Sequence, residues 1–440
     1  MTDTRTSPSA DPLPPESPNP DDAPASVGIR IGRRLAAAFQ YRDFRVLWFG
    51  ACTSSIGTWM QSLAENWLVL SLTGSALFLG LDAFLQQLPI MLFTLIGGVL
   101  ADRRDRRQTL LGSQYVQMTS AAILALLVYF DVVRIWHILA LSFLTGCAQS
   151  FGGPAYQALI PSLVKPRDLT NAIALNSIQF NLARVIGPLL AGAMLAAFAR
   201  AGATEQTAMS ACFGLNALSF LVVIVALLSL HVKHIPATHT RPILDDLRGG
   251  LAYVRGERPI FVLIVLAAAT AFFGFPILTL LPLLAKNVFG GDVGRYSALM
   301  AFSGAGAIAG ALIVAWLGRF RHMGLTILLV QLSFGGVMLA VAVSRTLWLT
   351  DLLLFLGGAA LMIAFSAATS LVQMLAPDEI RGRVMSIYLV AFRGGMPLGS
   401  LASGYLASLT SAPVALGVNG VCVSLVSVYV LLRSRSMRRL

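Results

Sequence analysis

The feature that most constrains this chain is a series of apolar runs, each long enough to cross a lipid bilayer as a helix. About 20 helical residues span the roughly 30 Å hydrocarbon core of a bilayer. Runs of at least that length fall at 45–72, 77–100, 109–130, 135–157, 170–198, 208–230, 259–284, 296–317, 324–344, 347–374, 383–409 and 412–432. They predict an all-α, multi-pass membrane protein with twelve transmembrane helices.

The charged residues support a membrane location. They make up 12% of the 440 residues, about half the share found in soluble domains. The net charge of +12 comes from short basic clusters between apolar runs and not from a continuous basic stripe, which argues against a nucleic-acid partner. The lipid bilayer is therefore the expected partner, and no obligate protein partner is evident.

The orientation follows from the stretch 97–107, where an apolar run ends in a cluster of arginines. Basic residues flanking spanning helices stay on the cytoplasmic side. If this cluster and both termini are cytoplasmic, most of the 32 lysines and arginines are cytoplasmic too. The connections on the other side hold only Arg134, Arg200, Lys286, Arg295 and Arg345.

The polar segments divide the chain into parts. Residues 1–40 begin with a stretch rich in Pro, Ser and Asp and lack the apolar core of a secretory signal, so we expect a disordered cytoplasmic tail. The longest polar connection, 231–258, is expected to be a cytoplasmic linker. It separates an N-terminal six-helix bundle at 41–230 from a C-terminal six-helix bundle at 259–440.

The two halves look like repeats of each other. Matching features recur at an offset of about 210 residues: Gly98 with Gly310, Pro166 with Pro377, Arg184 with Arg393, and Pro188 with Pro397. A parallel repeat of this kind predicts two pseudo-symmetric bundles with a pathway between them.

One motif resembles that of a known family. The residues Gly98-x-x-x-Asp102-Arg103-x-Asp105-Arg106-Arg107 are similar to the loop signature of the major facilitator superfamily, usually G-x-x-x-D-R-x-G-R-R. Asp105 stands where that signature has glycine. The segments 57–61, 72–76, 171–177, 183–188 and 381–386 resemble the bacterial drug and siderophore exporter branch, of the enterobactin-exporting type.

This resemblance implies alternating access in the bacterial inner membrane and, usually, export of a small-molecule substrate in antiport with protons. It also implies a gate in which Asp102 pairs with the N-terminus of the helix at 383–409. The residues assigned to gating are Gly98, Asp102, Arg103, Arg106, Arg107, Arg381 and Arg383. Asp102→Asn is expected to slow transport.

Two acids are the candidates for proton coupling. Glu65 and Asp82 each lie about eight residues from the turn near Thr73, in antiparallel neighbouring helices, so we place them at a similar depth. If both face the pathway, repulsion and desolvation would keep a proton on at least one of them. The alternative is that the first helix ends early and Glu65 is hydrated.

Two intramembrane arginines are candidates for substrate binding. Arg184 falls near the membrane midplane and needs a partner, which could be an anionic substrate group, a carboxylate such as Glu65, or backbone carbonyls. Arg393 is its counterpart in the repeat, and two such arginines would favour an anionic substrate.

Other polar positions could line the same cavity or could hydrogen bond between helices: Gln149, Tyr156, Gln157, Gln179 and Asn181. The small residues and prolines Gly187, Pro188, Gly192 and Pro397 are expected to allow close helix crossing and kinks.

No enzymatic constellation emerges. The histidines His137, His231, His234, His239 and His322 lack metal-ligand spacing, and neither a phosphate-binding loop nor a nucleophile with an evident base is present. We expect no cofactor and no metal. The favoured function is an exporter of a small amphipathic or anionic molecule. The alternatives are an importer or lipid translocator of the same fold, and a non-transporting receptor or scaffold.

Overall fold

The computed structural model describes residues 37–103, 105–230, 251–318 and 320–440, with side chains for all of these except 94–103 and 439. The helices of the first half are α2 (Arg42–Thr73), α3 (Ala76–Arg103), α4 (Arg106–Tyr129), α5 (Ile135–Leu163), α6 (Leu169–Arg200) and α7 (Glu205–Leu228). Short one-turn segments are η2 (Ala37–Gln40) and η3 (Pro166–Asp168). The described residues form helices and connections, without a strand, so the all-helical prediction is confirmed.

The second half begins with a segmented span made of α9 (Arg258–Ala269), η4 (Thr270–Gly274), α10 (Pro276–Leu283) and η5 (Leu284–Val288). It continues with α11 (Val293–Leu317), α12 (Met323–Val343), α13 (Leu347–Leu375), α14 (Arg381–Leu409), α15 (Ala412–Arg433) and the short α16 (Arg435–Arg439).

The apolar character of these helices fits a membrane. Within the described residues, ten helices are long and apolar enough to cross a bilayer. The long helices α2 and α5 are not among the ten. Both contain polar residues that belong to the candidate site. Ten of the twelve predicted spanning helices therefore have the length and apolar character that a span needs.

Turns between the helices have local causes. Gly74 ends α2 in the left-handed conformation, with φ of 62°, and its N–H bonds the carbonyl of Leu70. We call the end of the molecule that contains this turn the α2–α3 end. The opposite end, which contains residues 164–168, is called the α5–α6 end.

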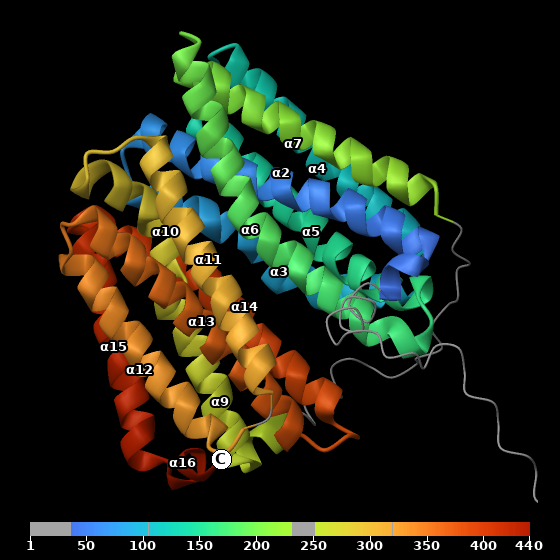
Figure 1. Cartoon of the computed structure of the whole chain (residues 1–440), viewed down its shortest axis with the longest axis vertical. Helices are drawn as coiled ribbons and strands as arrows, with labels where there is room; N and C mark the ends of the chain where they lie inside the picture. Colours follow the sequence, from blue (N-terminus) through green and yellow to red (C-terminus); the bar gives the residue numbers. More distant parts are fainter. Residues whose placement is uncertain (1–36, 104, 231–250, 319) are drawn as a thin grey trace, which may run out of the picture.

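The helices of each half lie together. Figure 1 shows α2 to α7, in blue to green, as one group and α9 to α15, in yellow to red, as another. The groups meet along two pairs of helices, α3 with α14 and α6 with α11. Glycines permit these approaches, since a Cβ on Gly80 of α3 would lie 2.5 Å from the carbonyl oxygen of Ser400 on α14.

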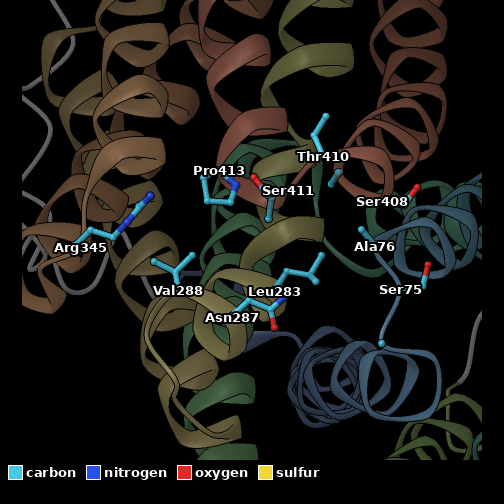
Figure 2. A pocket seen from close by; sticks show the side chains of 13 residues that line it. Ser75, Ala76, Leu283, Asn287, Val288, Arg345, Ser408, Thr410, Ser411 and Pro413 are labelled. Atoms are coloured by element: carbon cyan, nitrogen blue, oxygen red, sulfur yellow. The ribbon is translucent and has the colours of Figure 1, made fainter.

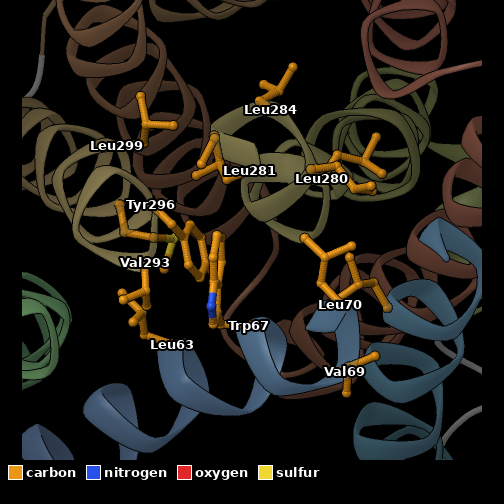
Figure 3. Close-up of a cluster of buried hydrophobic side chains, with 14 of the residues drawn as sticks. Leu63, Trp67, Val69, Leu70, Leu280, Leu281, Leu284, Val293, Tyr296 and Leu299 are labelled. Atoms are coloured by element: carbon orange, nitrogen blue, oxygen red, sulfur yellow. The ribbon is translucent and has the colours of Figure 1, made fainter. Parts of the chain in front are cut away.

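An apolar cluster near the α2–α3 end contains side chains from both groups. Trp67 of α2 stacks on Tyr296 of α11, with ring centroids 6.3 Å apart, and Leu281 of α10 lies beside them, while Leu280 belongs to the same cluster (Figure 3). Asn66 donates a hydrogen bond of 3.2 Å to the Tyr296 hydroxyl. The two halves are thus packed together at this end.

The first span of the second half is not a regular α-helix. Two π-helical turns, η4 and η5, interrupt it. A Cβ on Gly399 would lie only 1.9 Å from the carbonyl oxygen of Phe272, so α14 packs directly on the backbone of η4. The sequence predicted one span, 259–284, without this irregularity.

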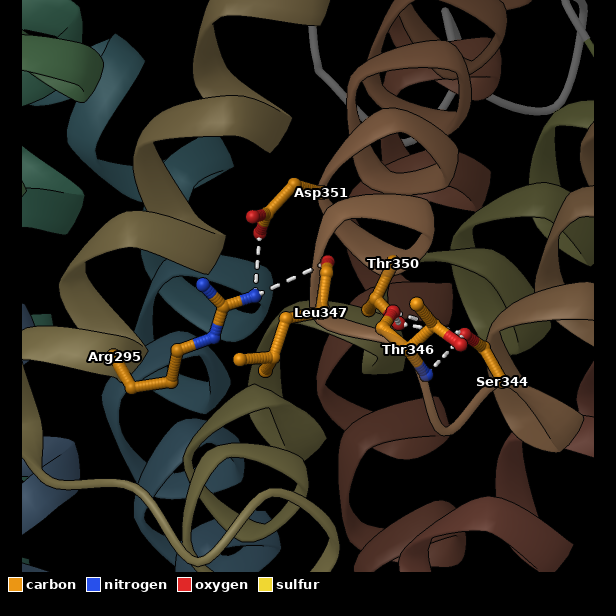
Figure 4. Close-up of polar contacts among 6 residues, drawn as sticks. All are labelled: Arg295, Ser344, Thr346, Leu347, Thr350 and Asp351. Atoms are coloured by element: carbon orange, nitrogen blue, oxygen red, sulfur yellow. Dashed lines mark hydrogen bonds and ion pairs between the residues drawn. The ribbon is translucent and has the colours of Figure 1, made fainter.

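An ion pair fastens α11 to α13 at the α2–α3 end. Arg295 donates to Asp351 at 2.8 Å and to the carbonyl of Leu347 at 3.3 Å (Figure 4). Nearby, Thr350 donates to Ser344 at 2.9 Å. These contacts join the start of α11 to the α12–α13 connection and the start of α13.

Candidate functional site

The two predicted acids come together inside the first half. Glu65 of α2 and Asp82 of α3 are each 5% exposed, and Ser142 of α5 is 2% exposed. The Ser142 Oγ lies 2.7 Å from Glu65 Oε1 and 2.6 Å from Asp82 Oδ1. The two acids thus contact one serine, and the Glu65 side chain is buried rather than hydrated.

A hydrogen-bond chain extends from this pair toward α7. Gln61 Nε2 donates to Glu65 Oε2 at 3.1 Å, and Asn216 Nδ2 of α7 donates to Gln61 Oε1 at 2.7 Å. Ser219 donates to Asn216 in turn. Gly57 makes room for this chain, since a Cβ there would lie 2.5 Å from Asn216 Oδ1. Glu65 is therefore held at both carboxylate oxygens.

Arg184 has no anionic partner among the described residues. It is 8% exposed, and its Nη2 atom is buried without a hydrogen bond. Its recorded contact is the face of Trp59, whose ring centroid lies 5.7 Å from Arg184 Cζ. Of the three partners that the sequence left open, Glu65 is already bound elsewhere, and no backbone carbonyl of the described residues accepts from Arg184.

Arg393 on α14 is in a different situation. It is exposed, and no described residue bonds it. Its neighbour Gly394 faces Met91 of α3, where a Cβ would lie 3.3 Å from the Met91 sulfur. The second arginine thus lies beside the junction of α3 and α14.

The polar positions of α5 and α6 divide into two kinds. Tyr156 donates to Asn176 at 2.7 Å, and Gln179 donates to Ser55 at 2.7 Å and to the carbonyl of Ala51 at 3.0 Å. These side chains bond helices together. Other candidates are more accessible: Gln149 and Gln157 are exposed, and Asn181 is half-buried and bonds the carbonyl of Ser177 at 2.9 Å.

The predicted gating side chains of Gly98, Asp102 and Arg103 lie outside the described side chains. Arg106 donates to the Ala158 carbonyl of α5 at 3.0 Å, and Arg107 donates to the carbonyls at the end of α7 at 2.6 and 2.7 Å. These two arginines tie the start of α4 to its neighbours.

The gating arginines at the start of α14 are half-buried or exposed. Arg381 pairs with Asp378 and donates to the carbonyl of Gln373 at 3.0 Å. Arg383 is half-buried. The pairing of Asp102 with this helix start stays a prediction.

The small residues of α6 lie at two helix crossings. A Cβ on Gly187 would lie 2.6 Å from Trp59 Cβ of α2, and one on Gly192 would lie 2.4 Å from Ser297 Oγ of α11. Ser297 donates to the carbonyl of Pro188 at 2.6 Å. Pro397 is buried within α14.

A cavity of about 530 Å³ lies at the α2–α3 end, between the two halves (Figure 2). Its polar lining includes Ser75 from the α2–α3 turn, Asn287 from η5, Arg345 from the α12–α13 connection, and Ser411 from the α14–α15 turn. The sequence did not indicate this cavity, because its residues come from connections far apart in the chain.

Sequence reasoning also missed Ser142 and Trp59. Serines recur along the spans, and Trp59 belongs to the segment 57–61, whose resemblance to the exporter branch says nothing about this contact. Ser142 follows Asp82 by 60 residues, and only the packing of α3 against α5 brings them together.

Comparison with known proteins identifies the family. The model of the transmembrane secretion effector family, a major facilitator family, matches residues 35–439. The staphyloferrin A transporter of Staphylococcus aureus is 28% identical over 85% of this chain and 93% of that protein. Macrolide efflux protein A of Streptococcus pyogenes is 23% identical over 83% and 89%, and the enterobactin exporter EntS of Citrobacter koseri is 26% identical over 92% of each chain.

Solved structures share the fold. A bacterial homologue of the human lysosomal transporter Spinster, in an inward-facing and occupied conformation, has a TM-score of 0.71 at 14% identity, covering 90% of this chain and 97% of that one. The helical fold, the family match and these relatives together show a multi-pass transporter of the bacterial inner membrane. The chain belongs to the transmembrane secretion effector family, within the drug and siderophore exporter branch of the major facilitator superfamily.

Proposed function

We propose that this protein exports a small amphipathic or anionic molecule in exchange for protons, by alternating access between two six-helix bundles. The α2–α3 end would be external and both termini cytoplasmic. The efflux and exporter names of several relatives support the direction. The observation that carries the coupling is the serine hydroxyl between two buried acids.

The hydrogen count at Ser142 explains why this arrangement can hold a proton. A serine hydroxyl has one hydrogen and can donate it to only one carboxylate. Its second short contact, with the other carboxyl group, then needs a hydrogen from that acid. Two ionised carboxylates this close and this buried would also repel strongly.

The partners of each acid suggest which one holds the proton. Glu65 accepts from Gln61 as well as from Ser142, so its ionised form is the better solvated. Asp82 has only the Ser142 contact among the recorded hydrogen bonds. In this state Asp82 would be protonated and Glu65 ionised, and release of one proton would follow when the helices separate.

The position of the pair suits alternating access. Asp82 lies on α3, which packs on α14 of the other half, and Glu65 lies next to Asn66, which bonds Tyr296. Movement between the halves would therefore change the surroundings of both acids. The cavity at the α2–α3 end lies where an exit would open.

Proton movement in everted membrane vesicles tests the proposal. The lumen is acidified, and enterobactin, staphyloferrin A and a macrolide are added in turn while a pH-sensitive dye reports the lumen. Wild type is expected to lose lumenal protons with at least one compound. Glu65→Gln and Asp82→Asn should abolish this loss, and Ser142→Ala should slow it by about tenfold, because the bridging hydroxyl is gone.

Ser210→Ala is the matched control. Ser210 is also a buried serine, but it donates only to the carbonyl of Ala125. Proton movement that survives in Glu65→Gln and Asp82→Asn would remove these acids from coupling. A compound that leaves the lumen together with protons would favour the importer alternative.

A further inference from the structure

Arg184 is a buried cation whose counter-charge is missing from the described part of the chain. The two buried acids of the first half, Glu65 and Asp82, share Ser142 instead. A buried charge without a partner is costly, and such groups within membranes commonly serve a ligand or ion. The Nη2 atom is buried and donates no hydrogen bond, so it can donate to a bound acceptor.

Exposed side chains lie on the face of α6 that leads to this arginine. Ile173, Ser177 and Phe180 are exposed and precede Arg184 by 11, 7 and 4 residues, so all four share one face of the helix. Beyond Arg184 the face is buried, because Pro188 and Gly192 pack on α11. The exposed stripe therefore starts at the α5–α6 end and stops at the guanidinium.

The backbone at Arg184 packs against the second half of the molecule. A Cβ on Gly304 of α11 would lie 3.3 Å from the carbonyl oxygen of Arg184 and 2.9 Å from Val185. Arg184 thus lies where α6 of the first half meets α11 of the second. A molecule bound to it would be in a position to sense whether the two halves are together.

A pair of packed aromatic rings lies beside the guanidinium. Trp59 lies under it, with the ring centroid 5.7 Å from Arg184 Cζ, and Phe180 meets Trp59 edge-on at 6.0 Å between centroids. A guanidinium stacked on a ring by its face keeps its N–H edge free for a carboxylate. An apolar ring in the ligand would lie against Phe180 and Trp59.

From this geometry we propose that Arg184, Trp59 and Phe180 form a subsite for the anionic group of an aromatic substrate, with a carboxylate on Arg184 and the ring against the two aromatic side chains. The subsite rests on the proposed transport function, and it narrows the substrate class to aromatic anions. It makes no use of the acid pair at Glu65 and Asp82.

Binding to the purified protein in detergent, without a membrane or a pH gradient, tests the subsite separately from transport. The probes are 1-naphthoate and its uncharged counterpart 1-naphthamide. Naphthoate is expected to raise the unfolding temperature of wild type and to quench tryptophan fluorescence, and naphthamide to do neither. Arg184→Met should weaken naphthoate binding at least tenfold, and Arg184→Lys should weaken it less.

The variants separate a binding role from a structural one. Without ligand, Arg184→Met is expected to unfold at a higher temperature than wild type, because an unpaired buried charge is removed. Trp59→Phe should lose most of the quenching, which assigns the signal to this ring, and should weaken naphthoate binding less than Arg184→Met does, because phenylalanine keeps an aromatic face. Arg200→Gln, an exposed arginine on the same helix, should behave as wild type.

Three results would overturn the subsite. These are equal binding of naphthamide, unchanged naphthoate affinity in Arg184→Met, and an Arg184→Met protein that is folded but less stable than wild type without ligand. Proton-coupled transport that persists alongside any of them would leave the exporter proposal in place and reject only this subsite.

Discussion

At the scale of single residues, Asp105 shows how a departure from a family signature can have a local cause. It is the N-cap of α4, and its carboxylate accepts from the N–H groups of Arg107 at 2.9 Å and Gln108 at 3.4 Å. A helix start leaves N–H groups without partners, and an aspartate side chain supplies one. The residue that replaces the usual glycine therefore stabilises the helix that follows.

Removing this cap should have a measurable cost. Asp105→Ala is expected to lower the free energy of unfolding by about 1 kcal/mol, whereas Asp105→Asn should be nearly neutral because asparagine caps equally well. Chemical unfolding in detergent, followed by circular dichroism, would measure both. A similar loss in the two variants would mean that the negative charge, and not the cap, is what matters.

The candidate site was predictable from the sequence where one turn connects its parts. Glu65 and Asp82 lie at equal distances from the same turn, so their common depth followed from helix geometry. The serine between them comes from α5, and long-range packing decides that contact. Arg184 was predicted to need a partner, but its contact with the Trp59 ring depends on helix packing that the sequence does not specify.

At the scale of elements, the helices were predictable because apolar length is a strong signal, while their contacts were not. In α11, Gly306 lies directly on the backbone of α13, where a Cβ would be 1.9 Å from the carbonyl oxygen of Phe355. In α12, Gly336 has open space around it. Both glycines sit in apolar helical sequence, so composition alone cannot separate a packing glycine from a permissive one.

These two glycines make a matched pair for a stability measurement. Gly306→Ala is expected to lower the free energy of unfolding by about 1–3 kcal/mol, because α11 and α13 must move apart. Gly336→Ala should be neutral or stabilising by up to about 1 kcal/mol, since alanine favours the helix. Thermal unfolding in one detergent compares them, and equal effects would contradict the close packing of α11 on α13.

The irregular turns of the first span in the second half also escaped prediction. Residues 259–284 contain a continuous apolar run, which reads as one regular helix. The π-helical turn η4 occurs where Gly399 lets α14 press on the carbonyl of Phe272. A backbone adjustment of this kind depends on a neighbour more than 100 positions away in the chain.

At the scale of the whole molecule, the contacts between the halves gather toward the α2–α3 end. Hydrogen bonds join Asn66 to Tyr296 and Ser297 to the carbonyl of Pro188, and Trp67 stacks on Tyr296. Tyr296 is completely buried between the two groups of helices. If the protein alternates between two states, these contacts stabilise the state in which this end is closed.

Tyr296→Phe tests that idea without removing the ring. The variant keeps the stacking on Trp67 but leaves the Asn66 side chain without its hydroxyl partner, at a cost of about 1 kcal/mol that falls only on the closed state. The ratio of open to closed molecules at the α2–α3 end should rise roughly fivefold, because an equilibrium shifts by the differential free energy of its two states.

Distances between spin labels at Arg200 and Thr410, two exposed positions at this end on opposite halves, would measure the ratio in a cysteine-free background. Tyr405→Phe is the control, because Tyr405 is 55% exposed and no recorded contact uses its hydroxyl. The longer distance should gain population in Tyr296→Phe alone. An unchanged distribution, or an equal shift in Tyr405→Phe, would mean that the Asn66 bond does not hold the two halves together.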